Sequence, residues 1–133
     1  VKLRHLDEWL KLRLEKASMY AQFLGGIEEL ELPYMESHSR HVFNYYTIRL
    51  RNSLKRDKMQ KYLNSQGIAT AIYYPLSLHL QEVFKSLGYK PGDFTESERA
   101  QEEVLSLPMY PELSEGQIEE VAKAIKTQMQ SER

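Results

Sequence analysis

Two adjacent tyrosines and a histidine stand where a predicted strand meets a proline. Tyr73 and Tyr74 end a run of β-branched and aromatic residues, and Pro75 ends the strand because it has no N–H to give a sheet ladder. His79 follows in the next turn. Polar side chains at the tip of a strand commonly face a ligand or a partner, which is the functional interpretation. The alternative is a hydrophobic turn in which half-buried tyrosines serve packing.

Two other sets of side chains have the right residue types for chemistry but unsuitable surroundings. His38 and His41 lie three residues apart, but zinc takes four donors in fixed geometry, and no cysteine or aspartate stands beside this pair. Ser77, His79 and Asp93 could be arranged as a hydrolytic triad, but no Gly-x-Ser-x-Gly turn exposes the serine. Glycine-rich phosphate loops are also absent from the sequence. The residues alone therefore predict no self-sufficient catalytic site.

The composition favours one nearly neutral domain. The chain has 133 residues, 18 Lys and Arg against 19 Asp and Glu, a formal net charge of -1 and no cysteine. This charge gives no field to hold nucleic acid or an anionic membrane, and disulfides and thiolate metal sites are excluded. No apolar run reaches the roughly 18 residues of a membrane span, so we expect a cytoplasmic protein. Val1 stands in place of an initiator methionine, which indicates either processing or a piece of a longer polypeptide.

The opening helix is the longest predicted element. Its apolar face has three- and four-residue spacing and comprises Leu3, Leu6, Leu10, Leu14, Ala17, Ala21 and Leu24. Gly25 and Gly26 then suit a left-handed helix end. A helix of about 22 residues spans about 33 Å, more than a domain of this size needs. We expect it either to bridge to another part of a protein or to be a long edge helix.

The remaining chain alternates short strands and helices. Strands are predicted at 27–33, 42–50, 69–74 and 104–107, and helices at 53–66, 79–87, 95–103 and from 115 onward. Thr95 with Glu98, and Ser114 with Gln117, have the spacing of capping boxes. The last helix has an apolar stripe at Ile118, Val121, Ala122, Ile125 and Met129. These elements predict an α+β fold in which helices pack on a small sheet.

Seven short motifs follow one another along the chain. They occupy residues 44–49, 56–57, 67–76, 78–81, 87–89, 97–98 and 105–111. In this order they resemble, from end to end, the C-terminal part of DegT/DnrJ/StrS-type sugar aminotransferases. The resemblance implies the small domain of a fold type I pyridoxal-phosphate-dependent transferase. Residues 1–26 would be a long linking helix from a large domain, and residues 27–133 would be the small C-terminal α+β domain.

The resemblance also implies an activity for the complete protein. Such enzymes use pyridoxal phosphate to pass an amino group from an amino acid, usually glutamate, to a keto group on a nucleotide-linked sugar. In the family, the Schiff-base lysine and the phosphate-binding residues belong to the large domain, and nothing in this sequence matches that lysine's neighbourhood. The cofactor needs both an anchor and a phosphate cradle. We therefore expect no cofactor and no catalytic residue in this chain alone, and a homodimeric parent.

The resemblance points to three substrate contacts. In the family, the loop at this strand end lies near the sugar nucleotide, often across the dimer interface. Carried over, it indicates Tyr73, Tyr74 and His79. Phenols and an imidazole can hydrogen-bond sugar hydroxyls or phosphate oxygens, and a tyrosine ring can cover a sugar or base. Many relatives have histidine where this chain has Tyr73, and His79 has the alternative of capping the helix that it opens.

Two classes of function fit these observations. The first is a piece of a sugar aminotransferase. The second is a free-standing, non-catalytic binding or regulatory module with the same fold, since relatives have been described as pleiotropic regulatory proteins. A piece of an enzyme should expose apolar surface on the first helix and around residues 70–81, and should self-associate through that surface.

Overall fold

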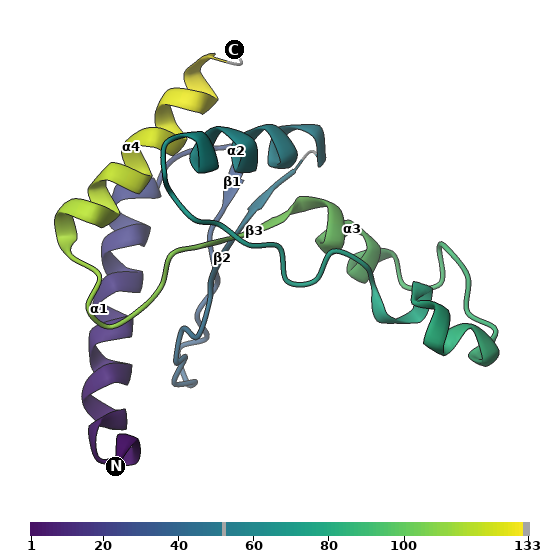
Figure 1. Ribbon diagram of the computed structural model, residues 1–133, viewed down its shortest axis with the longest axis horizontal. Coiled ribbons are helices and arrows are strands. Elements are labelled where there is room, and N and C mark those ends of the chain that lie inside the picture. The colour runs from purple at the N-terminus through teal and green to yellow at the C-terminus, as the bar shows by residue number, and fades with distance from the viewer. Residues whose placement is uncertain (52, 132–133) are drawn as a thin grey trace.

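A three-stranded antiparallel sheet lies at the centre of the computed structural model, which describes residues 1–51 and 53–131 (Figure 1). The strands, in spatial order, are β1 (Leu30–Glu31), β2 (Tyr46–Leu50) and β3 (Val104–Leu107). In the β2–β3 pair, Tyr46 lies opposite Leu107 and Ile48 opposite Leu105. The predicted α+β class, with helices on a small sheet, is confirmed.

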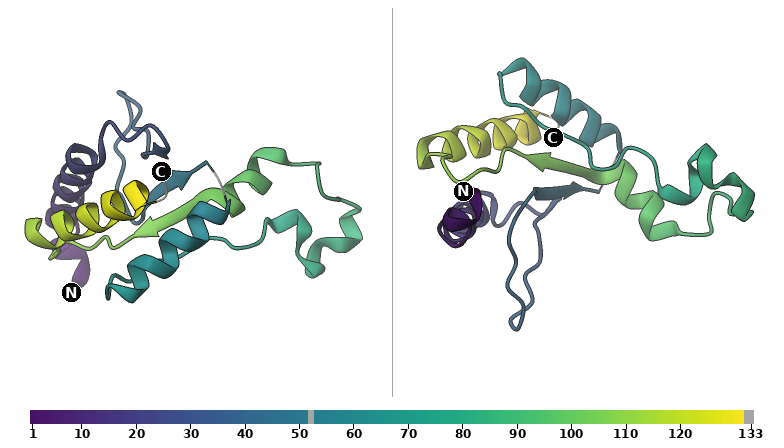
Figure 2. Two further views of the ribbon diagram at one scale, coloured as in Figure 1. Left: turned by 90° about the horizontal axis from the view of Figure 1, so that it is seen from above. Right: turned by 60° about the horizontal axis from the view of Figure 1, so that its bottom comes forward.

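Helices cover one face of this sheet. In the described residues the α-helices are α1 (Leu6–Leu24), α2 (Ser53–Ser65), α3 (Thr95–Glu103) and α4 (Glu115–Ser131). The same residues contain the short 3-10 helices η1 (Lys2–His5), η2 (Leu78–Leu80) and η3 (Glu82–Leu87). α2 and α4 lie over the sheet, and α4 also packs against α1 (Figure 2). None of the described helices combines the length and the apolar character that crossing a membrane requires.

The core forms between this helical layer and alternate residues of β2. Tyr46, Ile48 and Leu50 are buried, whereas Thr47 and Arg49 on the opposite face are only partly so. This alternation follows from the two-residue period of a strand. All five predicted apolar positions of α4 are buried, and each fully buried aliphatic side chain stabilises the fold by about 1.5–3 kcal/mol. Tyr20 of α1 completes the core by stacking on Tyr46, with ring centroids 4.8 Å apart.

Only the C-terminal half of α1 takes part in the core. Ala17, Tyr20 and Leu24 are buried, but Leu3 is 83% exposed and Leu6 43% exposed. The predicted apolar face is therefore only partly buried, because the N-terminal half of the helix extends beyond α4 and the sheet (Figure 1). The helix ends at the predicted glycine pair, with Gly25 as its C-cap (φ -59°, ψ 145°). Of the two glycines, Gly26 has the left-handed conformation with positive φ.

The two predicted capping boxes have different outcomes. At α4 the box forms, because the Ser114 N–H donates to Gln117 Oε1 at 2.9 Å and the Gln117 N–H donates to Ser114 Oγ at 3.2 Å. At α3 the prediction is wrong about the cap residue. Thr95 is the first helical residue, and Phe94 occupies the cap position without a side-chain cap. Glu98 instead accepts the N–H of Gly92, so it serves the preceding turn.

Two predicted elements around the tyrosines are wrong. Residues 69–74 do not form a strand, since Ala71 alone pairs with Ser106 of β3 through N–H···O distances of 3.1 and 2.8 Å. The predicted helix at 79–87 is two 3-10 helices separated by the extended residue Gln81. Residues 76–94, here called the arm, extend away from the sheet (Figure 1). An apolar stripe with nothing to pack against does not stabilise a continuous helix.

Candidate functional site

Three exposed tyrosine rings meet where the arm leaves the sheet. The ring centroids of Tyr45 and Tyr73 lie 4.5 Å apart, and those of Tyr73 and Tyr74 lie 6.2 Å apart in an edge-on arrangement. Their exposed fractions are 54%, 45% and 71%. A cis peptide bond joins Tyr73 to Tyr74. The structure thus brings the two predicted tyrosines together and adds Tyr45 to them.

The sheet places Tyr45 and Tyr73 on its face away from the core. Thr47 lies opposite Ser106, which in turn pairs with Ala71, and the hydroxyl oxygens of Thr47 and Ser106 are 2.8 Å apart. Tyr45 stands two residues before Thr47 and Tyr73 two residues after Ala71, so both share this face. Tyr45 was not among the residues predicted from the sequence. The two-residue period of the strand could have identified it, because Tyr45 alternates with the buried Tyr46.

Two clefts, each of about 270 Å³, flank Tyr73. The first, here called the Tyr74 cleft, is mostly apolar, and its lining includes Tyr74, Leu76, Leu78, Ser97 and Gln101. The second, here called the Tyr45 cleft, is more polar, and its lining includes Asn44, Tyr45, Thr70, Ser106 and Met109. Tyr73 contributes to the lining of both clefts. A ligand with two parts could therefore contact both faces of this region.

Helix α3 holds the turn that follows the tyrosines. The backbone N–H of Ser77 donates to Gln101 Oε1 at 2.6 Å, and Ser97 Oγ donates to Ser77 Oγ at 3.1 Å. Ser77 is buried. Its hydroxyl therefore pairs with Ser97 rather than with His79, and the structure does not assemble the triad of Ser77, His79 and Asp93. These bonds fix the wall of the Tyr74 cleft.

His79 lies apart from the tyrosines. Its Nε2 is 2.9 Å from Glu98 Oε1, its side chain is 7% exposed, and its ring lies 4.9 Å from that of Phe94. The N–H of Gly92 and the bond from His79 lower the pKa of the Glu98 carboxyl below its ordinary value. His79 lies inside η2 and does not cap it, so the capping alternative is wrong. It lines a separate cavity of about 330 Å³.

The remaining candidates do not add to this site. His41 Nδ1 accepts the N–H of Phe43 at 3.0 Å, and His38 Nδ1 lies 3.8 Å from Glu36. Within residues 1–51 and 53–131, no three His, Asp or Glu side chains gather as a metal ion would require.

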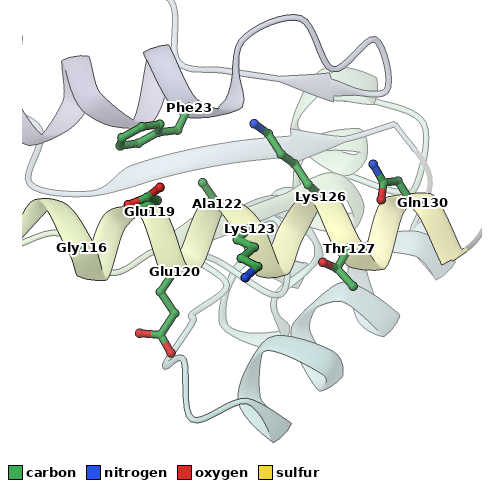
Figure 3. Close-up of a pocket in the computed structure, with 9 residues that line it drawn as sticks. All are labelled: Phe23, Gly116, Glu119, Glu120, Ala122, Lys123, Lys126, Thr127 and Gln130. Atoms are coloured by element: carbon green, nitrogen blue, oxygen red, sulfur yellow. The ribbon is translucent and has the colours of Figure 1, made fainter.

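An open groove of about 690 Å³ lies between α1 and α4 (Figure 3). Phe23 is on one side, and long charged side chains of α4, including Glu119, Lys123 and Lys126, are on the other. In Figure 3, Lys123 and Lys126 point in different directions and do not converge on one point. This groove is therefore a weaker candidate site than the two clefts beside Tyr73.

Comparison with known proteins gives a consistent result. Residues 1–126 match the DegT/DnrJ/EryC1/StrS aminotransferase family. A protein of Geobacillus stearothermophilus named pleiotropic regulatory protein is 49% identical over 127 residues, which is 94% of this chain and 33% of that protein. The UDP-N-acetyl-3-dehydro-alpha-D-glucosamine 3-aminotransferase of Acidithiobacillus ferrooxidans is 38% identical, over 92% of this chain and 31% of that protein.

The crystal structure of S. venezuelae DesV, in complex with a ketimine intermediate, has the same fold. It matches with a TM-score of 0.89 and 30% sequence identity, covering 99% of this chain and 34% of DesV. The chain thus spans about a third of the length of the curated relatives that it matches. The resemblance based on the short motifs is confirmed, and so is the expectation that the relatives include a pleiotropic regulatory protein.

Proposed function

The chain belongs to the DegT/DnrJ/EryC1/StrS aminotransferase family, and from that premise we propose that it is the small C-terminal domain of a sugar aminotransferase. Residues 1–26 would link it to a large domain, and residues 27–133 would form the domain itself. The observation that carries the proposal is the family match over residues 1–126. The exposure of Leu3 in η1 and of Leu6 at the start of α1 supports a linking role.

The proposed reaction moves an amino group from an amino acid, with glutamate as the expected donor, to a keto sugar carried on a nucleoside diphosphate. The relative from Acidithiobacillus ferrooxidans supports this substrate class, because its name specifies a UDP-linked dehydro sugar. Pyridoxal phosphate, when bound, supplies the electron sink for such a transfer. The contribution of this chain is to bind and orient the sugar nucleotide.

The described residues of this chain do not fit the cofactor. A Schiff-base lysine works best in a desolvated site, but every lysine in the described ranges is at least partly exposed. The lining of the two clefts beside Tyr73 contains no lysine or arginine within the described part of the chain. We therefore assign no step of the transfer to these residues. The chain alone should be inactive, with the cofactor held by residues outside it.

Tyr73 and Tyr74 are the proposed substrate contacts. Their hydroxyl groups make no hydrogen bond within residues 1–51 and 53–131, so both can donate to or accept from a sugar nucleotide. The edge-on arrangement of the two rings also exposes part of each ring face. At His79 the proposed contact is restricted to Nδ1, because Nε2 is engaged by Glu98.

The complete protein is proposed to be a homodimer. The arm exposes several large apolar side chains, including Leu78 (64%), Val83 (75%) and Leu87 (62%). Exposed apolar surface of this kind commonly marks an interface. Burial of these side chains against the large domain or the second subunit would account for their exposure in this chain.

A second candidate function has its own support. The relative from Geobacillus stearothermophilus that is 49% identical to this chain is named a pleiotropic regulatory protein. A regulatory module would bind a sugar nucleotide through the same tyrosines without turning it over. Both candidate functions predict binding of a sugar nucleotide, but only the aminotransferase predicts transfer of an amino group to it.

An assay of the protein expressed from its complete reading frame separates them. The protein is reconstituted with pyridoxal phosphate and incubated with L-glutamate and a UDP-linked keto sugar, and both 2-oxoglutarate and the amino sugar are measured. Equal amounts of the two products, dependent on the cofactor, are expected for the aminotransferase. Binding of the sugar nucleotide without either product would support the regulatory module instead.

A further inference from the structure

The Tyr45 cleft has an aromatic wall with free polar groups at its rim. Tyr45 and Tyr73 stack on each other but are 54% and 45% exposed, so each keeps ring surface open. The Asn44 carboxamide makes no hydrogen bond to any described residue. The hydroxyl of Ser106, which lines the cleft, already pairs with the hydroxyl of Thr47 at 2.8 Å. The groups left for a ligand are thus aromatic faces, phenol hydroxyls and one carboxamide.

No Lys, Arg, Asp or Glu belongs to the described lining of this cleft. Diphosphate and carboxylate groups bind best where cations or several N–H donors converge. The cleft therefore suits an uncharged, planar group. At about 270 Å³ it is also slightly smaller than the roughly 300–1,000 Å³ of pockets that hold whole small-molecule ligands, so it would take one part of a larger ligand.

An arginine of α1 holds the backbone at the rim of the cleft. Nη1 of Arg13, on α1, donates to the backbone oxygens of Phe43 at 3.1 Å, Asn44 at 3.2 Å and Met109 at 3.2 Å. Asn44 precedes β2 and Met109 follows β3, and both line the cleft. One guanidinium thus ties two segments of the lining to the long helix, and a site held in this way loses little entropy when a ligand binds.

We propose that the Tyr45 cleft binds the pyrimidine base of the sugar nucleotide, while the sugar lies across Tyr73 on the side of Tyr74. The base stacks on Tyr45, and the Asn44 carboxamide, which has a donor and an acceptor side by side, pairs with the carbonyl and N–H edge of uracil. This inference rests on the proposed function, since it names the subsite for one part of that substrate. Tyr45 and Asn44 become specificity-determining residues.

Calorimetric titration of the complete protein tests this subsite. UDP, UDP methylated at N3 of the base, and ribose 5-phosphate are each titrated into the wild type and into Tyr45→Leu, Tyr45→Phe and Asn44→Ala. Stacking of a base on an aromatic side chain predicts that Tyr45→Leu raises the Kd for UDP about tenfold, and that Tyr45→Phe stays within about twofold. Asn44→Ala should weaken UDP several-fold but leave the Kd for N3-methyl UDP unchanged.

Tyr34→Leu is the matched control, because Tyr34 is 78% exposed and outside both clefts. It should bind UDP as the wild type does. An unchanged Kd for UDP in Tyr45→Leu, in a protein that still makes the amino sugar, would overturn the subsite and leave the proposed function standing. Absence of both UDP binding and amino transfer in the wild type would overturn the two together.

Discussion

The core and the arm of this molecule use apolar residues in opposite ways. In the core, Ile48, Leu63, Ile118 and Ile125 are completely buried between the sheet and its helices. In the arm, Val83 is 75% exposed, although it belongs to a stripe of apolar residues with helical spacing. Two hydrogen bonds between Ser77 and α3, together with the contacts of Glu98, hold the arm instead. The core is therefore needed for folding, whereas the side chains of the arm are available to a ligand or a partner.

Truncation of one aliphatic side chain in each region gives the largest expected contrast. Ile48→Ala should destabilise the 133-residue chain by about 2–4 kcal/mol, because it leaves a cavity in the core. Val83→Ala should change stability by less than about 0.5 kcal/mol. Urea unfolding followed by circular dichroism measures both. Equal losses would mean that the arm is part of the cooperative core and would break the comparison.

Alkaline pH should destabilise the core through its tyrosines. Burial raises the pKa of Tyr46 to about 12 and also raises the pKa of Tyr20. Because the folded pKa lies above the unfolded value of about 10, this contribution is complete below pH 10 and is lost between about pH 10 and pH 12. The free energy of unfolding falls by about 2–3 kcal/mol for a pKa raised from 10.0 to about 12. Thermal melts across this range should show a shallower decline for Tyr46→Phe than for Tyr34→Phe.

A change at the base of the arm should loosen it without unfolding the core. Gln101→Ala removes the acceptor of the hydrogen bond from the N–H of the buried Ser77. This should lower the free energy of local opening of the arm by about 1–2 kcal/mol. Hydrogen exchange should then become faster in residues 76–80, with the urea midpoint of the core unchanged. Gln66→Ala is the control, because Gln66 is exposed and lies outside the arm, just after α2. Equal acceleration in α4 would show that arm and core open together.

The smallest expected effect concerns one hydroxyl. If Tyr74 contacts the sugar nucleotide in the complete protein, Tyr74→Phe should weaken substrate binding by about 1 kcal/mol and leave the cofactor absorbance intact. Steady-state kinetics together with the visible spectrum measure this. Unchanged kinetics would return Tyr74 to a packing role.

Sequence periodicity predicted the elements that form the core. The stripe of α4, its capping box and strand β3 were all confirmed. The stripe and the apolar side chains of β3 are buried in the core or partly so, and the capping box depends only on residues three positions apart. The arm followed its sequence pattern poorly. Residues 69–74 have strand composition but meet β3 only at Ala71, and η2 and η3 have helical spacing without a surface to pack on. The spacing of residues within a segment does not show whether another element packs against that segment.

The candidate site was predicted only in part. Tyr73 and Tyr74 were identified from their place before Pro75 and from the motif order, and they do lie together beside two clefts. Tyr45 was missed, because its proximity to Tyr73 depends on two long-range pairings, Thr47 with Ser106 and Ser106 with Ala71. His79 was grouped with the tyrosines by sequence distance, but its ring faces Glu98 and Phe94 instead.

The central claim is that the exposed tyrosine region, and not the core, binds the sugar nucleotide. Hydrogen exchange of the complete protein with and without a saturating UDP-linked sugar tests it most directly. We expect slower exchange in residues 44–46 and 70–79 on binding, and unchanged exchange in residues 118–129 of α4. Binding that leaves residues 44–46 and 70–79 unchanged, and protects only other parts of the protein, would contradict it.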